Sequence, residues 1–424
     1  MSNTQVKLPA ATATIASCVL AACCEGFDLQ AAGVAAAGII PEFRPTAQQL
    51  GTFFSASTLG LFAGALIGGR LSDSLGRKRI LIASIILFGC FSILTAAAWD
   101  IHSLSWARLL TGCGLGGAFP NLLALVNECS RAHRRRANVA LVYGSMPFGG
   151  ALASLLSMLN APAHWRVIFL AGGIVPLLLA PALLRVLHES PAFTRLARAA
   201  PTAHAAVGPH CVAASRAGSY IAIFADGRAL PTVLLWISSF LGLLTLYLFV
   251  SWLPTLLVGN GLTKAQAAGG QIAFNVGGAL AASLMGQLLE GRWRNVAIVV
   301  TFLAVPSFVL LLGRGPAEFV VVVGAAFALG CAVLAALGFL YASTPACYPA
   351  AIRGVGSGVA VAVGRLGSIV GPKLGGALQA AGHGTSQLLA DILPLVILGS
   401  LVGLAFAWST ARQQLAAGEA TDAR

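Results

Sequence analysis

The feature that most constrains this chain is the recurrence of long apolar stretches that contain no Asp, Glu, Lys or Arg. Hydrophobic residues make up 58% of the 424 positions and charged residues only 9%, whereas soluble domains carry about 25% charged residues. A helix of about 20 apolar residues spans a bilayer. We therefore expect an all-α integral membrane protein whose spanning helices lie near residues 12–40, 50–69, 80–99, 104–127, 137–160, 166–187, 230–258, 265–289, 295–313, 318–342, 353–378 and 388–410. These are twelve transmembrane helices.

The positive charges are distributed unevenly between the predicted loops. With the N-terminus placed inside, nineteen of the Lys and Arg residues outside the membrane fall on the inner side. Four fall on the other side, namely Arg44, Arg166, Lys264 and Arg314. Such a bias predicts that both termini are cytoplasmic in a multi-pass protein of the cell inner membrane. The net charge of +13 is therefore interpreted as a topology signal, and no nucleic-acid partner is expected.

The chain also repeats itself. The segment Gly69–Arg79 and the segment Gly286–Arg294 begin 217 residues apart, and each turns basic after an acidic residue. Arg136 and Arg353 are separated by the same 217 residues. Parallel six-helix repeats of this kind are typical of secondary transporters that bind substrate between the halves. We expect six-helix bundles at 1–187 and 229–424, joined by a cytoplasmic linker at 188–228.

Two carboxylates interrupt the first predicted span. Glu25 and Asp28 are three residues apart, so both project from the same side of a helix. Ionisable residues inside a membrane are costly and are usually functional. Two acids that face one interior can share or exchange a proton. The alternative is a pair of structural acids that are bonded to neighbouring helices.

Three cations fall within the predicted spans: Arg108, Arg365 and Lys373. A guanidinium group matches a carboxylate in a bidentate geometry, so Arg365 near the midplane suits an aromatic carboxylate. The alternative is a structural arginine bonded to the first or fourth helix. Arg108 is expected beside Asp28 or Glu25, and Lys373 is expected to extend to the outer interface.

A charged segment follows the second predicted helix. It contains Asp73 and Arg77 and reads as a loop from Gly69 to Arg79. We expect it to form a latch that closes the transporter on one side, or else only to anchor the topology. Glu128 is expected to form a structural ion pair with the inner loops, beside the basic cluster at 131–136.

At these residues the chain resembles the major facilitator superfamily. Gly69–Arg79 is similar to the signature loop of that superfamily, and Arg108 with the glycines at 112, 114, 116 and 117 resembles its fourth-helix motif. Glu25–Asp28 is similar to the first-helix motif of its aromatic acid/proton symporters, although Asp is more common at the first position. The longer string to Val34 most resembles transporters of 3-(3-hydroxyphenyl)propionate and related phenylpropanoids.

The resemblance implies roles for particular residues. Proton coupling is expected at Glu25, Asp28 and Arg108. Substrate binding is expected at Arg365, with Phe27 and Tyr341 as candidates to stack on an aromatic ring. Gating and conformational change are expected at Asp73, Arg77, Glu128 and Arg353.

The function predicted is import of an aromatic carboxylate by proton symport with alternating access. Two alternatives remain open: a proton-driven efflux antiporter for drugs or aromatic compounds, and a receptor that senses aromatic acids without transport. The partners expected are a small aromatic carboxylate, protons and the lipid bilayer, with a monomeric chain. No enzyme is expected, because the sequence contains no metal-ligand constellation, nucleophile elbow or phosphate loop. No cofactor or metal site is expected either, because the nine cysteines fit no ligand pattern and suit apolar packing.

Overall fold

The computed structural model describes residues 8–131, 134–159, 164–187, 189, 222–225, 227–316, 318–349 and 352–422. Over these ranges the chain is helical and contains no strand. The long helices are α1 (Leu8–Phe43), α2 (Ala47–Leu75), α3 (Arg77–Ala96), α4 (Ile101–Cys129), α5 (Arg135–Leu159), α6 (Arg166–Val186), α9 (Ala229–Gly259), α10 (Lys264–Glu290), α11 (Arg294–Arg314), α12 (Phe319–Ser343), α13 (Arg353–Ala380) and α14 (Thr385–Asp422). A short 3-10 helix, η3 (Thr344–Cys347), precedes α13.

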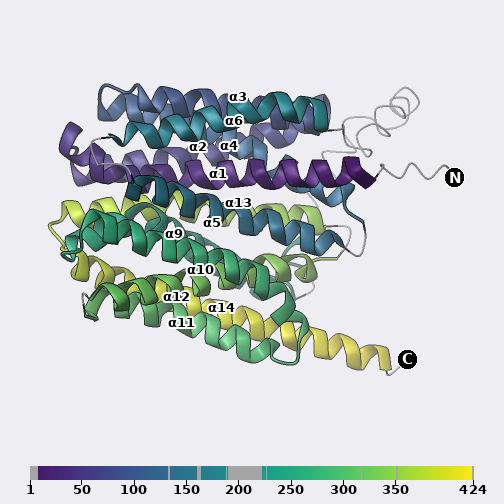
Figure 1. The fold of residues 1–424 in the computed structure, drawn as a ribbon. Helices are drawn as coiled ribbons and strands as arrows, with labels where there is room; N and C mark the ends of the chain where they lie inside the picture. Colours follow the sequence, from purple (N-terminus) through teal and green to yellow (C-terminus); the bar gives the residue numbers. More distant parts are fainter. Residues whose placement is uncertain are drawn as a thin grey trace.

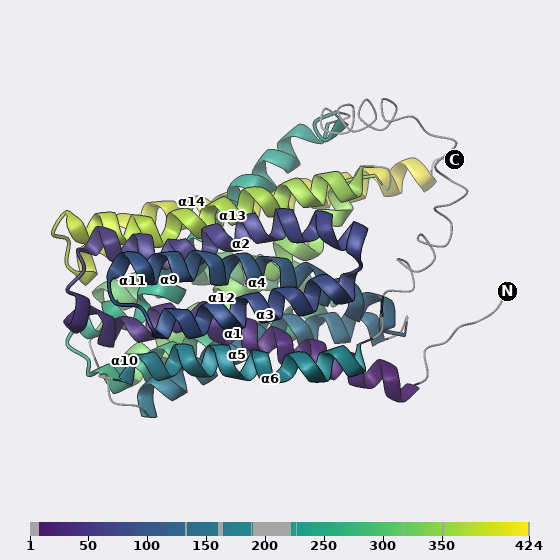
Figure 2. The same ribbon diagram turned by 90° about the horizontal axis from the view of Figure 1, so that it is seen from above.

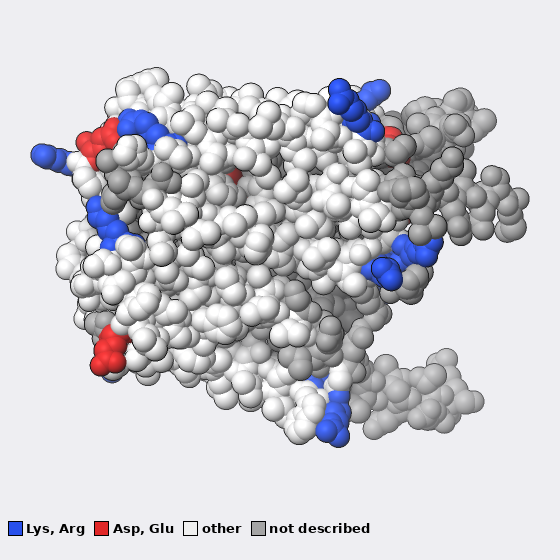
Figure 3. Space-filling model, in the orientation of Figure 1, with Lys and Arg blue, Asp and Glu red and all other residues white. Residues whose placement is uncertain are grey.

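Each predicted span coincides with one of these helices, so the all-α, twelve-helix prediction is confirmed. Among the described residues, eleven helices are long and apolar enough to cross a membrane, and α10 is the twelfth long helix. The charged side chains on the visible face gather at the two ends of the molecule and leave a white band between them (Figure 3). That band is the surface expected to meet lipid tails.

The helices form two groups that lie one above the other in Figure 1. In the first half, α2 packs against α4 and α1 packs against α5; in the second half, α10 packs against α12 and α9 against α13. The halves meet where α2 contacts α13 and where α5 contacts α10. Both termini lie at the same end of the bundle in Figures 1 and 2. We call this the terminal end, and the other the opposite end.

Glycines bring helices of the first half into close contact. A Cβ atom at Gly60 or Gly64 of α2 would lie 2.0 Å from a backbone oxygen of α4. A Cβ atom at Gly112 or Gly116 of α4 would lie 2.1 Å from a backbone oxygen of α2. Helices in lipid associate through such close backbone packing. Gly112 and Gly116 of α4 therefore belong to a packing surface against α2.

A capping box fixes the start of α4 and thereby the depth of Arg108. The Asp100 side chain accepts a hydrogen bond from the backbone N–H of Ser103 at 2.7 Å, and the Ser103 hydroxyl caps the backbone of Asp100. These bonds from Ser103 hold the pKa of the exposed Asp100 carboxyl below its usual value. Arg108 follows two turns later, inside the apolar part of the helix.

The segment Gly69–Arg79 differs from its prediction as a loop. Helix α2 continues to Leu75 and α3 begins at Arg77, so only Gly76 separates them. Gly76 has φ of 98° and ψ of 148°, a conformation open essentially to glycine alone. The charged residues of this segment led to its prediction as a loop. At the membrane surface, however, charged side chains reach water while the backbone stays hydrogen-bonded within a helix. The side chain of Asp73 lies outside the described residues.

The two halves are in close contact at the opposite end. A Cβ atom at Gly51 of α2 would lie 3.0 Å from the carbonyl oxygen of Pro372 and 3.1 Å from the Cα atom of Gly376 on α13. The Trp252 indole of α9 donates to the same Pro372 oxygen at 2.9 Å. The Ser55 hydroxyl donates to a carbonyl of α13 at 2.9 Å. The structure is therefore closed at this end.

Candidate functional site

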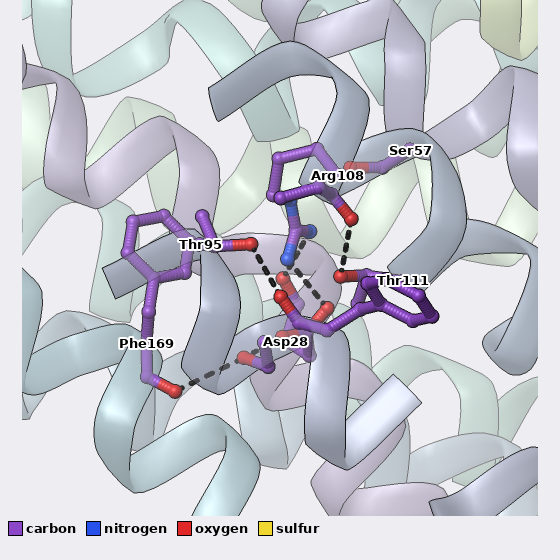
Figure 4. A network of polar contacts seen from close by, with 9 residues as sticks. Asp28, Ser57, Thr95, Arg108, Thr111 and Phe169 are labelled. Carbon is purple, nitrogen blue, oxygen red and sulfur yellow. Dashed lines mark hydrogen bonds and ion pairs between the residues drawn. The ribbon is translucent and has the colours of Figure 1, made fainter. Parts of the chain in front are cut away.

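A buried ion pair joins α1 to α4 in the first half (Figure 4). The Arg108 Nη1 atom lies 2.8 Å from Asp28 Oδ2, and Nη2 donates to the Asp28 carbonyl oxygen at 2.9 Å. The Nε atom of Arg108 donates to the Ser57 hydroxyl of α2 at 2.8 Å. Both charged side chains have an exposed fraction of 0%. The expectation that Arg108 neighbours an acid of the first helix agrees with this geometry, and the acid is Asp28.

Further bonds complete the surroundings of Asp28. The Ser92 hydroxyl of α3 lies 2.7 Å from Asp28 Oδ1 and 3.0 Å from the carbonyl oxygen of Phe169 on α6. The Arg108 guanidinium lies over the Phe169 ring, 5.5 Å from its centroid. Both carboxylate oxygens of Asp28 thus have partners, from α3 and α4 of the same half. A buried pair is tolerated in an apolar interior when its remaining hydrogen-bonding atoms are satisfied in this way.

Glu25 has a different environment from Asp28. Its side chain is 1% exposed, and neither carboxylate oxygen has a hydrogen-bond partner among the described residues. Arg365 of α13 attracts it electrostatically from the other half. Desolvation opposes the charged form of Glu25, and Arg365 supports it.

Three tyrosines surround Arg365. The Arg365 Nη1 atom donates to the Tyr247 hydroxyl of α9 at 3.3 Å. Tyr143 of α5 and Tyr341 of α12 are also within electrostatic range of the guanidinium. Glu25 of the first helix attracts Arg365, in line with the interpretation as a structural arginine near the first or fourth helix. The hydrogen bond of Arg365, however, is donated to Tyr247 of α9. Tyr143 was not foreseen, because nothing in an isolated apolar helix indicates which side faces the other half.

Two buried amides on α10 were also missed from the sequence. Gln271 is 0% exposed and has no partner for its amide oxygen or nitrogen among the described residues. Asn275, one turn further along, is 5% exposed and has an unpaired amide nitrogen. Unsatisfied polar atoms inside a protein are rare and costly, so they point to a missing partner. Two amides spaced by four in an apolar helix were the signal available in the sequence.

The amides lie at the depth of the acidic motif of α1. A Cβ atom at Gly149 of α5 would lie 2.8 Å from the backbone nitrogen of Phe27, and one at the adjacent Gly150 would lie 3.0 Å from Asn275 Oδ1. Next to Asn275, the ring of Phe274 lies 6.4 Å from that of Phe249, which is two residues from Tyr247. Asn275 therefore lies beside α5 at the depth of the acidic motif, and α10 contacts α9 nearby.

Phe27 faces the interior of the first half. Its ring lies 3.4 Å from the point where a Cβ atom would stand on Gly172 of α6. Tyr341 lies with the Arg365 cluster instead. Of the two aromatic candidates for substrate stacking, Tyr341 is the one beside the arginine.

The residues expected in gating lie at the terminal end. Arg77, the first residue of α3, forms an ion pair with Glu128 near the end of α4, so both partners belong to the first half. Glu128 was expected to form a structural ion pair with the inner loops, and its partner Arg77 belongs to the predicted inner segment Gly69–Arg79. Arg353 donates from Nε to the carbonyl oxygen of Tyr348 at 3.3 Å, across the start of α13. Burial raises the pKa of the Tyr348 phenol.

Among the described residues, no group of three or more His, Cys, Asp or Glu side chains is arranged to hold a metal ion. The described cysteines are free thiols. Burial raises the pKa of the Cys347 thiol in η3 to about 11, which keeps it protonated and unreactive at neutral pH.

Several known transporters are similar to this chain in sequence. The chain is 41% identical to the 3-(3-hydroxy-phenyl)propionate transporter of Escherichia coli over 388 residues, 92% of each chain. It is 32% identical to the gallate transporter of Pseudomonas putida, over 88% of this chain and 86% of that one. It is 30% identical to the 4-hydroxybenzoate transporter of Pseudomonas putida, over 89% and 88% of the two chains.

Solved structures share the fold. A D-xylose–proton symporter superposes with a TM-score of 0.76 at 16% identity, covering 93% of this chain and 97% of the other. A bacterial homologue of the human lysosomal transporter Spinster, in an inward-facing conformation, superposes with a TM-score of 0.66. The family model of the Major Facilitator Superfamily matches residues 18–372 of this chain. With its twelve helices and a polar centre between two halves, this chain belongs to the major facilitator superfamily.

Proposed function

We propose that this protein imports an aromatic carboxylate together with protons across the cell inner membrane, by alternating access. The observation that carries the proposal is the buried Glu25 carboxyl, which has no hydrogen-bond partner among the described residues and is attracted electrostatically by Arg365 of the other half. The names of the relatives, which transport hydroxylated aromatic acids, support this substrate class. The excess of basic residues at the terminal end supports a cytoplasmic location for both termini. We propose a monomeric chain, because the central site is built within it.

Arg365 provides the coupling between substrate and proton. Without substrate, the charge of Arg365 favours the ionised form of Glu25, against the burial that opposes it. A bound carboxylate takes over the guanidinium, and Glu25 is left as a buried charge with no counter-ion. Because an isolated buried carboxylate is strongly disfavoured, Glu25 then binds a proton. Anion and proton therefore occupy the site together, and the loaded carrier reorients with less buried charge.

The remaining polar groups suit the rest of such a molecule. Tyr143, Tyr247 and Tyr341 provide aromatic faces and hydroxyls beside the carboxylate position. Gln271 and Asn275 offer amide donors and an acceptor that have no partner in the part of the chain that the structure describes. A phenolic hydroxyl on the ring supplies both a donor and an acceptor for them.

Asp28 and Arg108 have a supporting role in this mechanism. Their bonds to each other and to Ser57 and Ser92 hold α1 in place beside α2, α3 and α4. Asp28 is thus a positioning residue, and Glu25 is the residue that exchanges the proton. This assignment differs from the expectation from the sequence, in which Glu25, Asp28 and Arg108 all take part in proton coupling.

Transport by purified protein in proteoliposomes tests the proposal. Labelled 3-(3-hydroxyphenyl)propionate, 4-hydroxybenzoate and benzoate are offered with and without an inward proton gradient. The wild-type protein should accumulate at least one acid only when the gradient is present. Glu25→Gln should lose accumulation but keep exchange of labelled for unlabelled acid, because the neutral amide mimics the protonated carboxyl.

Glu318→Gln is the matched control, since Glu318 is an exposed acid at the start of α12. It should transport like the wild type. If the wild type accumulates none of the acids, the import proposal fails and efflux must be assayed. If Glu25→Gln still concentrates substrate along a proton gradient, Glu25 is not the coupling residue.

A further inference from the structure

A cavity of about 650 Å³ opens at the opposite end, between α1, α5, α9 and α10. Val34 and Pro41 of α1, Met158 of α5, Trp165 beside α6 and Val258 of α9 contribute to its mostly apolar walls. Pockets of this size and apolar character are typical of small-molecule sites. Both halves of the transporter supply the lining, so the cavity lies between them at this end.

The cavity is separated from the central site by a contact between α1 and α9. The Gln30 amide, one turn deeper than Val34, donates to the Val250 carbonyl oxygen at 3.0 Å. A Cβ atom at Gly33 would lie 2.5 Å from the same oxygen. These contacts form a floor, with the cavity on one side and Glu25 on the other. In the closed arrangement, the cavity is a compartment outside the floor.

The charge on the cavity comes from Lys264, the first residue of α10. Its Nζ atom donates to the Ala37 carbonyl oxygen at 3.3 Å, and an ammonium has two further N–H donors. His164 is the other titratable side chain in the lining. On the rim, Arg166 and Glu42 bond to each other, so their charges balance. An apolar slot with one ammonium group suits a flat ring that carries a carboxylate.

The side of α10 that lines the cavity continues to the buried amides. Lys264 and Ala268 line the cavity, and Gln271 and Asn275 follow at spacings of three and four residues. Residues with these spacings lie on one side of a helix. An acid that leaves the cavity when the floor opens therefore meets Gln271 and then Asn275 along the same helix.

We infer that this cavity is a second binding site for the transported aromatic carboxylate, with Lys264 holding the carboxylate outside the closed floor. The inference rests on the proposed function, because it takes the same substrate class. The cavity site fills from the opposite end while the central site is closed to it. The two sites have separate cations, Lys264 and Arg365, so each can be removed alone.

Equilibrium binding of labelled 3-(3-hydroxyphenyl)propionate to the full chain in lipid nanodiscs tests the inference. The wild type should bind two molecules per chain. Lys264→Met and Arg365→Met should each bind one, and the double variant none. Lys264→Arg should restore the second molecule, and affinity at the cavity should fall at least about tenfold when the charge is lost.

A local signal identifies the site. Trp165 is 2% exposed and forms part of the cavity wall, so ligand should quench its fluorescence in Arg365→Met. Trp165→Phe should remove that signal. Lys373→Met is the matched control, because Lys373 is another exposed lysine, located on the part of α13 that lies toward the opposite end of the molecule.

The outcomes separate the two proposals. One molecule bound by the wild type, lost in Arg365→Met and unchanged in Lys264→Met, overturns the cavity site and leaves the proposed function standing. No binding by the wild type at all overturns the proposed function. A lipid chain that fills the cavity would give the first of these results.

Discussion

Asp28 and Glu25 are three residues apart on one helix, yet their surroundings are opposite in kind. Each oxygen of Asp28 has a partner in its own half, whereas Glu25 has no hydrogen bond among the described residues. A satisfied buried charge contributes to the fold, and an unsatisfied one is available for exchange. The two acids should therefore respond differently to the same substitution.

Asp28→Asn should destabilise the protein strongly. The amide cannot balance the Arg108 charge, and breaking one side of a buried pair costs about 3–5 kcal/mol. Thermal unfolding in detergent should show a clear decrease in the transition temperature. Glu25→Gln, which removes a carboxylate with no bonded partner, should unfold close to the wild-type temperature. Equal losses for the two variants would contradict the separation of roles.

Asn275→Leu should reduce the preference for hydroxylated acids. The apolar side chain removes an unpaired amide, so the protein should stay as stable as the wild type or become more stable. Uptake of 3-(3-hydroxyphenyl)propionate should fall relative to 3-phenylpropionate by about tenfold, which corresponds to one hydrogen bond. Ser154→Ala, which removes a buried hydroxyl already bonded within α5, is the control. A loss that is equal for both acids would indicate a structural role for Asn275.

The sequence was sufficient to pair Arg108 with an acid of α1, because a buried cation needs a counter-charge and few were available. It was not sufficient for Tyr143, Gln271 or Asn275. An apolar spanning helix is hydrophobic on every side, so its sequence does not show which side faces the partner half. The same limit applies to Phe27, whose ring faces α6.

At the scale of elements, the contact between α2 and α13 closes the opposite end. Gly51→Leu should hold this contact apart, since a Cβ atom already meets backbone atoms at 3.0 and 3.1 Å. Trp252 is buried at this contact, with its ring 5.1 Å from Phe54. In Gly51→Leu, the Trp252 emission should shift to the red and become accessible to iodide.

The contribution of Trp252 is isolated by comparing each protein with its Trp252→Phe form. Gly69→Leu on the same helix is the control, because a Cβ atom there meets nothing within 4 Å. Unchanged Trp252 accessibility in Gly51→Leu would show that this contact does not control closure.

Charge-free stretches predicted the helices well in the membrane but poorly at its surface. Helix α2 was expected to end near 69 and continues to Leu75; α14 was expected to end near 410 and continues to Asp422. Lipid demands apolar side chains, whereas helical hydrogen bonding does not, so a change to charged residues marks the edge of the bilayer. Helix α2 ends at Gly76, which has a positive φ. The glycine is the one sign of this helix end in the sequence.

The whole molecule shows a division of charge between its ends, which predicts its orientation. A cleavable tag added after Arg424 should be cut by external protease only in inside-out vesicles. A tag inserted after Gly382, in the turn between α13 and α14, should be cut only in right-side-out vesicles. The reverse pattern would overturn the cytoplasmic assignment and the direction of import with it.

Arg108 and Arg365 respond differently to a rigid-body motion of one half against the other. Arg108 and Asp28 travel together in one half, so their attraction is the same at every angle between the halves. Arg365 and Glu25 belong to different halves, so theirs changes with that angle. In the proposed mechanism, a proton on Glu25 would therefore weaken the attraction between the two halves and leave the Asp28–Arg108 pair within the first half unchanged.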